Sequence, residues 1–279
     1  MVAMALASIP AALLAQWPDY PTARVARTPD GKPKLDAAAP RTADGKPDLS
    51  GIWLFRGAGR PPTQPGAEPA GAPPPPPPEQ PASGPPAATF RNIGAGFKDG
   101  LPLTPWAAEL LKQRMAENSK DNPDAHCLPL GLMQLHTHPQ PRKIIQTPGV
   151  VVILYEAQAG VRQIFTDGRP LPGNDPQPWW YGYSIGKWDG DTLVVETTGF
   201  RDDVWLDING SPLTDAAKLT ERFQRLNYGT LRIDVTIDDP KAYTAPFSVR
   251  VNQRLILDSE LIEFICNENE KSVQHMVGK

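Results

Sequence analysis

The stretch LTERFQRLNYGTLRIDVTI, residues 219–237, decides the fold of this chain. Its second half alternates strictly between apolar and polar residues, the apolar ones being Leu231, Ile233, Val235 and Ile237. Because side chains of a strand alternate between two faces, this pattern predicts a strand with one buried and one wet face. Asn227-Tyr228-Gly229 interrupts the stretch with turn residues, so the whole stretch predicts an antiparallel hairpin.

Strand-like segments of the same kind fill the chain after Arg142. Short turns such as Asp189-Gly190-Asp191 separate them, and tight connections favour antiparallel neighbours. A meander has exposed edges, and closure into a barrel removes them most completely. We therefore predict a mainly β fold, an antiparallel meander that closes into a β-barrel. The expected strands are 49–55, 143–147, 150–156, 161–166, 180–188, 192–198, 219–226, 230–237, 247–257 and 260–266.

One packed α-helix is expected before most of the strands. Thr104 suits the N-cap, Pro105 suits the first helical position, and residues 106–118 are rich in good helix formers. Trp106 and Leu110 share one flank of this helix, so we expect that flank to pack on the sheet.

The chain divides into four segments of different composition. Within the second segment, RTPDGKPKLD at 27–36 is repeated as RTADGKPDLS at 41–50, and the Asp-Gly and Lys-Pro pairs predict turn-rich arms. The third segment contains six consecutive prolines and favours an extended surface excursion. The segments are an apolar N-terminus at 1–16, an arm and first strand at 17–56, a Pro/Gly/Ala-rich excursion at 57–90, and a helix and barrel domain at 91–279 completed by 49–56.

The apolar N-terminus indicates export. MALASIPAALLA at 4–15 is typical of the apolar core and cleavage site of a signal peptide, with a docked apolar helix as the alternative. Export predicts a periplasmic or secreted protein. An oxidising compartment would also favour a disulfide between the two cysteines, Cys127 and Cys266, although their spacing leaves open whether they lie close together.

Composition limits the partners. Lys and Arg total 28 against 31 Asp and Glu, which gives a formal net charge of -3. Such a chain lacks the cationic surface that neutralises a phosphate backbone, so nucleic acid is not an expected partner. No apolar run reaches the roughly 20 residues that span a bilayer. We expect a soluble mature protein that binds a small molecule.

Two resemblances follow from short motifs. Gly51-Ile52-Trp53 at the start of the expected meander resembles the Gly-x-Trp start of lipocalins and other calycin barrels. That resemblance implies a cup with an internal ligand site. GKWDGDTLVVETTGF at 186–200 and TERF at 220–223 are similar to a group of exported bacterial proteins. The second similarity extends over most of the chain after Arg41 and implies no activity.

The histidines form one candidate metal site. On an extended segment, His136 and His138 would lie on the same face, and His is a common metal ligand. A third ligand could come from His126 or from Glu156. Gly131 followed by this pair resembles the cupin metal motif. However, Arg142 stands near the place of the cupin glutamate, and no second cupin motif follows. Loop histidines without metal are the alternative.

Aromatic residues gather in the second half of the chain. Clusters of this kind stack on sugar rings or planar aromatic ligands, although they can equally fill the mouth of a barrel as core. The candidate substrate-binding residues are Trp179, Trp180, Tyr183, Trp188 and Trp205.

Two glutamates lie on expected strands, Glu221 among apolar neighbours of the same face. A buried carboxylate has a raised pKa or pairs with an arginine, for which Arg169 and Arg250 are the expected candidates. A buried acid and base suit proton transfer, and a structural ion pair is the alternative. The candidate catalytic residues are Glu196, Glu221, Asp167 and Arg169.

Three functions remain open. The first is an exported hydrolase, lyase or isomerase that acts on a small glycosidic or aromatic substrate in the barrel mouth by carboxylate chemistry. No phosphate loop, dinucleotide fingerprint or Gly-x-Ser-x-Gly elbow is present, so no organic cofactor is favoured. The second is a lipocalin-like carrier of an apolar or aromatic ligand. The third is a cupin-like enzyme with a divalent metal at His136 and His138.

Overall fold

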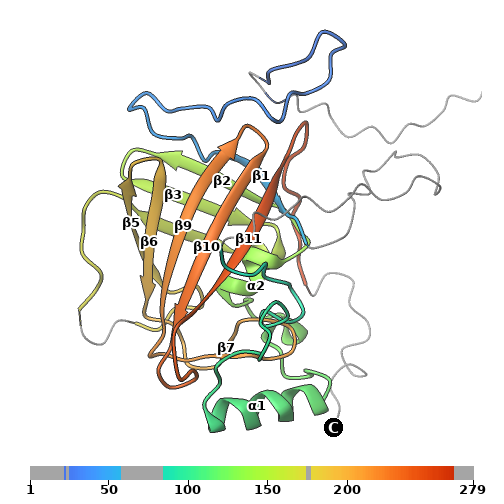
Figure 1. Ribbon diagram of the computed structural model, residues 1–279, viewed down its shortest axis with the longest axis vertical. Helices are drawn as coiled ribbons and strands as arrows, with labels where there is room; N and C mark the ends of the chain where they lie inside the picture. The colour runs from blue at the N-terminus through green and yellow to red at the C-terminus, as the bar shows by residue number, and fades with distance from the viewer. Residues whose placement is uncertain (1–21, 23–24, 58–83, 174–176, 267–279) are drawn as a thin grey trace, which may run out of the picture.

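A computed structural model of the chain describes residues 22, 25–57, 84–173 and 177–266. Nine strands form a closed barrel in the order β1-β11-β10-β9-β6-β5-β4-β3-β2 (Figure 1). The predicted closed, mainly β barrel is therefore confirmed. The barrel strands are β1 Gly51–Phe55, β2 Arg142–Thr147, β3 Val150–Tyr155, β4 Val161–Phe165, β5 Tyr183–Asp189, β6 Thr192–Thr198, β9 Lys218–Asn227, β10 Thr230–Asp238 and β11 Phe247–Ile256.

The alternation that predicted the central hairpin decides which side chains fill the barrel. The four apolar residues of β10 are at most 1% exposed, and the polar residues between them face outward. β10 pairs with β9 on one side and with β11 on the other over most of its length. Eight of the nine barrel strands bury apolar residues against the same interior, which gives the barrel a continuous core; β5 contributes Ser184 instead.

The weakest pairing in the barrel joins β4 and β5. These strands run parallel and share two register pairs, Ile164 with Ser184 and Phe165 with Ile185. The expectation that all neighbours are antiparallel is wrong here, because the long connection over residues 166–182 lets the chain return in the same direction. We call this pairing the β4–β5 seam.

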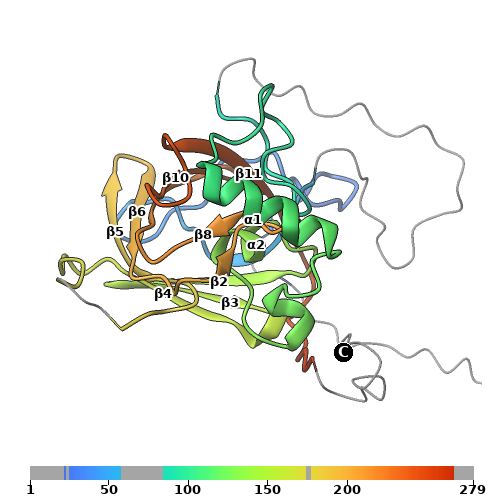
Figure 2. The same ribbon diagram turned by 90° about the horizontal axis from the view of Figure 1, so that it is seen from below.

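The short helix α2 (Leu132–Thr137) closes the lower end of the barrel, and all six of its residues are buried (Figure 2). Arg142 at the start of β2 donates from Nη1 to the carbonyl oxygen of His136 at 2.6 Å and from Nη2 to that of His138 at 3.0 Å. A cation at the end of a helix satisfies carbonyl groups that lack partners within the helix. Arg142 therefore ties α2 to the barrel wall.

Helix α1 (Pro105–Ala116) crosses the same end outside α2 (Figure 2). The Thr104 side chain accepts a hydrogen bond from the amide of Ala107, so the predicted N-cap is confirmed. The expected packing flank is wrong: Trp106 is 53% exposed, whereas Ala107 is fully buried. The helix lies over the two-stranded sheet of β7 (Val204–Trp205) and β8 (Pro212–Leu213), where a small residue allows close approach.

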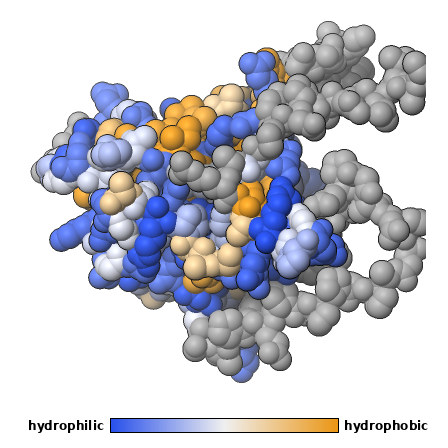
Figure 3. All heavy atoms as spheres, turned by 90° about the horizontal axis from the view of Figure 1, so that it is seen from above, coloured by the Kyte–Doolittle hydropathy of each residue, from blue (hydrophilic) through white to orange (hydrophobic). Residues whose placement is uncertain are grey.

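The repeated arms have the same local structure twice. In each copy a threonine amide bonds to a lysine carbonyl four residues later at 2.9 Å, in Thr28 with Lys32 and in Thr42 with Lys46. The predicted turns are therefore present, and they lie at the end of the barrel opposite α1 (Figure 1). Viewed onto that end, the surface is mainly hydrophilic with separate apolar patches (Figure 3).

The chain after β11 corrects one expectation. Residues 260–266, predicted as a strand, form no strand. The amide of Ile262 donates to the side chain of Glu156, at Oε2 and 3.1 Å, and not to a neighbouring strand. We call residues 259–266 the C-terminal segment. It ends at a disulfide between Cys266 and Cys127, which lies directly after a 3-10 helix, Pro123–His126. The disulfide prediction is confirmed.

Two of the expected segments include residues that the structure does not describe. The signal segment at 1–16 and residues 58–83 of the proline-rich excursion at 57–90 lie outside the described residues. None of the helices in the described part of the chain has the length and apolarity needed to cross a bilayer.

Candidate functional site

Polar side chains line the barrel interior next to α2. Seven strands contribute one residue each, and α2 adds His136 in their midst. Every one of the eight is at most 3% exposed. We call this set the interior polar cluster, consisting of His136, Arg142, Tyr155, Arg162, Ser184, Thr197, Glu221 and Gln253.

Glu221 of β9 lies at the centre of the interior polar cluster. Its Oε1 atom lies 2.7 Å from His136 Nε2 and accepts from Arg162 Nη1 at 3.0 Å, while Oε2 accepts from Arg162 Nη2. Burial opposes the charged form of this carboxyl. The Arg162 charge and the hydrogen bonds from His136 and Arg162 outweigh burial and lower the pKa of Glu221 to about 2. Glu221 is therefore an ionised carboxylate in a buried ion pair, and a weak base.

Arg162 of β4 holds the β4–β5 seam together. Its Nε and Nη2 atoms donate to the Ser184 hydroxyl on β5 at 3.1 and 3.0 Å, and Nη2 also donates to the Thr197 hydroxyl on β6 at 3.0 Å. Because the backbone ladder between β4 and β5 has only two register pairs, these bonds connect strands that the backbone connects weakly. The arginine side chain therefore completes the wall at its weakest point.

His136 is held as a neutral ring. Burial lowers its pKa, although the neighbouring Glu221 raises it in part. A carboxylate at Nε2 favours the tautomer that carries the proton there, which leaves Nδ1 as an acceptor. This arrangement of acid, oriented imidazole and arginine resembles an active site in its chemistry, but solvent does not reach it in this conformation.

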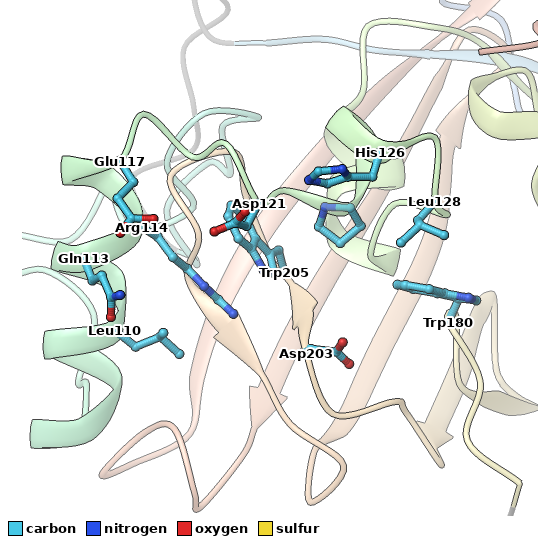
Figure 4. A pocket seen from close by; sticks show the side chains of 11 residues that line it. Leu110, Gln113, Arg114, Glu117, Asp121, His126, Leu128, Trp180, Asp203 and Trp205 are labelled. Carbon is cyan, nitrogen blue, oxygen red and sulfur yellow. The ribbon is translucent and has the colours of Figure 1, made fainter. Parts of the chain in front are cut away.

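A second site, open to solvent, lies beneath the barrel between α1 and β7. It is a cavity of about 350 Å³ that combines aromatic, acidic and basic side chains. Figure 4 shows Arg114 reaching from α1 toward the centre, with Leu128 and Trp180 on the side away from α1. We call it the end pocket; its walls are Leu110, Gln113, Arg114, Glu117, Asp121, Pro123, His126, Leu128, Trp180, Asp203 and Trp205.

The two tryptophans of the end pocket each carry a guanidinium on the ring. Arg114 lies 4.3 Å from the ring centroid of Trp205, and Arg201 lies 4.6 Å from that of Trp180. Arg114 also donates from Nη1 to the carbonyl oxygen of Gly210 at 2.8 Å. Burial lowers the pKa of Arg114 to about 10, so the group stays charged at neutral pH. These contacts hold the aromatic walls in place.

Three carboxylates, Glu117, Asp121 and Asp203, line the end pocket. Glu117 and Asp121 both contact Lys120, with nitrogen–oxygen distances of 3.1 and 3.5 Å. Asp203 forms no hydrogen bond or ion pair within the described chain, although its charge acts on Arg114. Asp203 also has a φ of 80°, a left-handed conformation that non-glycine residues rarely adopt. Asp203 is thus an exposed carboxylate that lines a cavity with aromatic walls and is not engaged in a direct ion pair with another described residue.

The other expected catalytic residues lie on the outer wall of the barrel. Glu196 contacts Lys218 at 2.5 Å, and both side chains are at least 40% exposed. Asp167 and Arg169 form an ion pair at 2.6 Å in a surface turn, and this hydrogen-bonded pair lowers the pKa of Asp167. The structure therefore separates Glu221 from these three residues. The expected partners of Glu221 are wrong, since Arg169 bonds to Asp167 and Arg250 bonds to Asp234.

The expected aromatic residues divide among three places. Trp180 and Trp205 lie in the end pocket. Trp179 and Tyr183 lie on the outer wall, where Tyr183 stacks on Phe165 at 5.3 Å between ring centroids. Trp188 lies near the second arm, with Lys46 Nζ at 6.0 Å from its ring centroid.

The histidine pair does not have the expected geometry. Residues 132–137 are helical, because the apolar run there buries all of its faces inside the barrel end. His136 therefore contacts Glu221, whereas the His138 ring packs edge-on against Phe90 at 5.0 Å, and burial lowers the pKa of His138 to about 4. His126 lies in the end pocket. Within the described ranges, no group of three or more His, Cys, Asp or Glu side chains is arranged to hold a metal ion.

Several site residues carry a signal that alternation could have revealed. Arg162 shares a strand face with Ile164, and Arg142 shares one with Ile144, so each arginine had to face the core. The end pocket carries no such signal. Asp203, His126 and Leu128 come from irregular segments whose meeting depends on the tertiary fold.

The chain was compared with known proteins. It matches no protein-family model and no curated protein. The class defined by the fold and the two sites is therefore a closed nine-stranded β-barrel with a helix in one end and a solvent-accessible pocket beneath it.

Proposed function

We propose that this protein binds a small organic cation that carries a ring, and that it does so in the end pocket. One observation carries the proposal: two tryptophans and three carboxylates meet around one open cavity. Aromatic faces attract cations through the ring quadrupole, and carboxylates add a Coulomb attraction that strengthens where water is displaced. A ring on the ligand gains further by stacking on Trp180.

The charges of the end pocket favour a cation over a neutral or anionic ligand. The residues that line it include three carboxylates, Glu117, Asp121 and Asp203, and one arginine, Arg114. Two further cations lie beside the lining: Lys120 at Glu117 and Asp121, and Arg201 on the Trp180 ring. Arg114 is already engaged by Trp205 and the Gly210 carbonyl. Asp203 is the carboxylate left to receive a ligand, because Lys120 compensates the other two.

We also propose that the protein is exported to the periplasm or the medium. The support is the Cys127–Cys266 disulfide, since disulfides persist mainly in oxidising compartments. Mass analysis of the purified mature protein from a host with a secretion pathway tests this: export requires recovery outside the cytoplasm.

Binding is tested with three probes that share one ring and differ in charge: benzylamine, benzyl alcohol and benzoate. We expect benzylamine to quench tryptophan fluorescence saturably and benzoate to bind most weakly. Asp203→Asn should weaken benzylamine about fivefold to tenfold, which corresponds to one exposed charge interaction. Trp180→Ala should weaken both benzylamine and benzyl alcohol.

The matched control is Asp202→Asn. Asp202 is exposed and directly precedes Asp203, but it does not line the end pocket. Its substitution removes the same formal charge and should leave benzylamine affinity within about twofold. Equal binding of the three probes, or equal effects of the two aspartate substitutions, would refute the cation proposal.

A second candidate function is acid–base catalysis on the bound ligand. The observation that favours it is an exposed imidazole, His126, in the same cavity as Asp203. Both side chains are exposed, so a bound ligand can reach the imidazole and the carboxylate that general acid–base catalysis would use. Screening of ester and glycoside derivatives of the tightest ligand, with His126→Asn and Asp203→Asn as variants, tests this. Turnover that survives both substitutions would exclude these residues.

A further inference from the structure

Three atoms of the interior polar cluster have no hydrogen-bond partner within the described chain: His136 Nδ1, Arg142 Nε and Gln253 Oε1. A fourth, Tyr155 Oη, has no hydrogen bond of good geometry there, although the Arg162 guanidinium also interacts with it. Each of these four residues is at most 3% exposed. Buried polar atoms are almost always paired, because an unmade bond costs about 1 to 3 kcal/mol. Three such atoms in one cluster, together with the Tyr155 hydroxyl, indicate that the cluster has a binding partner.

Hydrogen bonds and strand register bring these four residues together. Arg142 Nη1 and Gln253 Nε2 both donate to the His136 carbonyl, at 2.6 and 3.0 Å. Arg142 and Tyr155 are register partners on β2 and β3, and both face inward. Cross-strand partners have Cβ atoms about 5 Å apart, so their polar ends are neighbours.

The charge of the cluster points to an anion. Arg142 and Arg162 are cations, and Glu221 is the single carboxylate among the eight cluster residues. That carboxylate pairs with Arg162. Arg142 donates to three backbone carbonyls, of His136, His138 and Gln140, none of which carries a full negative charge. A buried cation without a counter-ion is costly, and an anion would offset that cost.

The donors and acceptors narrow the class of anion. Arg142 Nε–H and the Tyr155 hydroxyl are donors, which suits a carboxylate with two acceptor oxygens. His136 Nδ1 in the neutral ring and Gln253 Oε1 are acceptors, and a hydroxyl group can donate its one proton to either of them. We propose that the interior polar cluster binds a small hydroxycarboxylate, whose carboxylate accepts from Arg142 and Tyr155 and whose hydroxyl donates to His136 Nδ1 or Gln253 Oε1.

Tyr155 belongs both to the interior polar cluster and to the wall of a surface groove. The groove has a volume of about 420 Å³ and lies between the β3–β4 connection and the C-terminal segment. A ligand that displaces the Tyr155 ring would pass from the groove into the interior polar cluster. This site is separate from the end pocket and does not depend on its function.

The test uses three probes of nearly equal size: glycolate, acetate and glycolamide. Calorimetry on the full chain should show one glycolate per protein, weaker binding of acetate, and weakest binding of neutral glycolamide. Tyr155→Phe removes one hydrogen bond to a charged group and should weaken glycolate about tenfold. Arg142→Lys, which keeps the charge but loses the Nε donor, should also weaken it.

The matched control is Tyr181→Phe. The Tyr181 ring lies 6.2 Å from that of Tyr155 but outside the interior polar cluster, so its substitution should leave glycolate affinity unchanged. Absence of saturable glycolate binding by the native chain would overturn the proposal, as would equal losses in Tyr155→Phe and Tyr181→Phe. Equal affinity for glycolate and acetate would overturn the assignment of the hydroxyl contacts.

Discussion

His136 Nε2 lies 2.7 Å from Glu221 Oε1, and this contact joins the helix inside the barrel to the barrel wall. Glu221 receives Arg162 on its other side, and Arg162 reaches across the β4–β5 seam. One carboxylate thus links α2, β4 and β9. The interior polar cluster therefore stabilises the fold, whether or not it also binds a ligand.

Replacing Glu221 by Gln should destabilise the protein strongly. The substitution leaves the Arg162 charge buried without a counter-ion, which costs about 3 to 5 kcal/mol in comparable buried pairs. The measurement is the free energy of unfolding by urea denaturation, with the slope compared to ensure that the folded state is retained.

Glu196→Gln is the control for this prediction. Glu196 pairs with Lys218 on the outer wall, where an exposed ion pair contributes about 0 to 1 kcal/mol. The two glutamates were equivalent catalytic candidates by sequence, so the comparison isolates burial. A loss below about 1 kcal/mol for both variants would contradict the structural role of Glu221.

Acidification should destabilise the fold through His136 and Glu221. Burial lowers the pKa of His136 from 6.5, so below that value the unfolded chain binds a proton that the folded chain does not. Glu221 acts in the same direction at lower pH, because its pKa falls from 4.5 to about 2 on folding. Stability should therefore decrease from about pH 7 to 5 and again below about pH 4.5.

The variants His136→Gln and His138→Asn separate the contributions to this pH dependence. Burial also lowers the pKa of His138, to about 4, so each substitution should flatten part of the decrease between about pH 7 and 5. The measurement is urea denaturation at a series of pH values. A slope that neither substitution changes would show that other groups control the acid response.

The alternation of apolar and polar residues predicted the barrel, because a strand that buries one face in the core needs apolar residues at every second position. Residues 192–198 of β6 match the expected bounds, and the bounds of β10 differ by one residue, since both strands have one face in the core. The same reasoning failed at α2. Its residues are buried on every side, so no polar face revealed a helical period.

The candidate sites were predictable in part. Alternation placed Glu221 among buried residues, and it could have placed Arg162 beside Ile164. The sequence did not reveal that Trp180 and Trp205 line the same pocket, because the end pocket is built from α1, loops and β7, which are far apart in the chain. Residues on loops carry no periodic signal, and their proximity is a result of tertiary packing.

Removal of the disulfide should lower stability considerably. Cys127 and Cys266 are 139 residues apart, and closing a loop of this length stabilises by about 5 kcal/mol in the chain-entropy model. The double variant Cys127→Ser/Cys266→Ser should therefore unfold at much lower urea concentration. The two chain neighbours of Cys127, His126 and Leu128, line the end pocket, so benzylamine affinity should fall as well. Unchanged stability and affinity would show that the bond is dispensable.

Gly131 should tolerate no side chain. A Cβ atom at this position would lie 2.1 Å from the backbone oxygen of Trp205, and a backbone atom held in β7 cannot move aside cheaply. Gly131→Ala should cost about 1 to 3 kcal/mol, as overpacking does in well-packed interiors, and should shift Trp205 in the end pocket.

Gly173→Ala is the control, because nothing lies within 4 Å of a Cβ atom there. Urea denaturation and benzylamine titration of both variants measure the two effects. If Gly131→Ala retained native stability, the close contact between α2 and β7 would be wrong; if it lost stability but kept full affinity, the end pocket would be independent of α2.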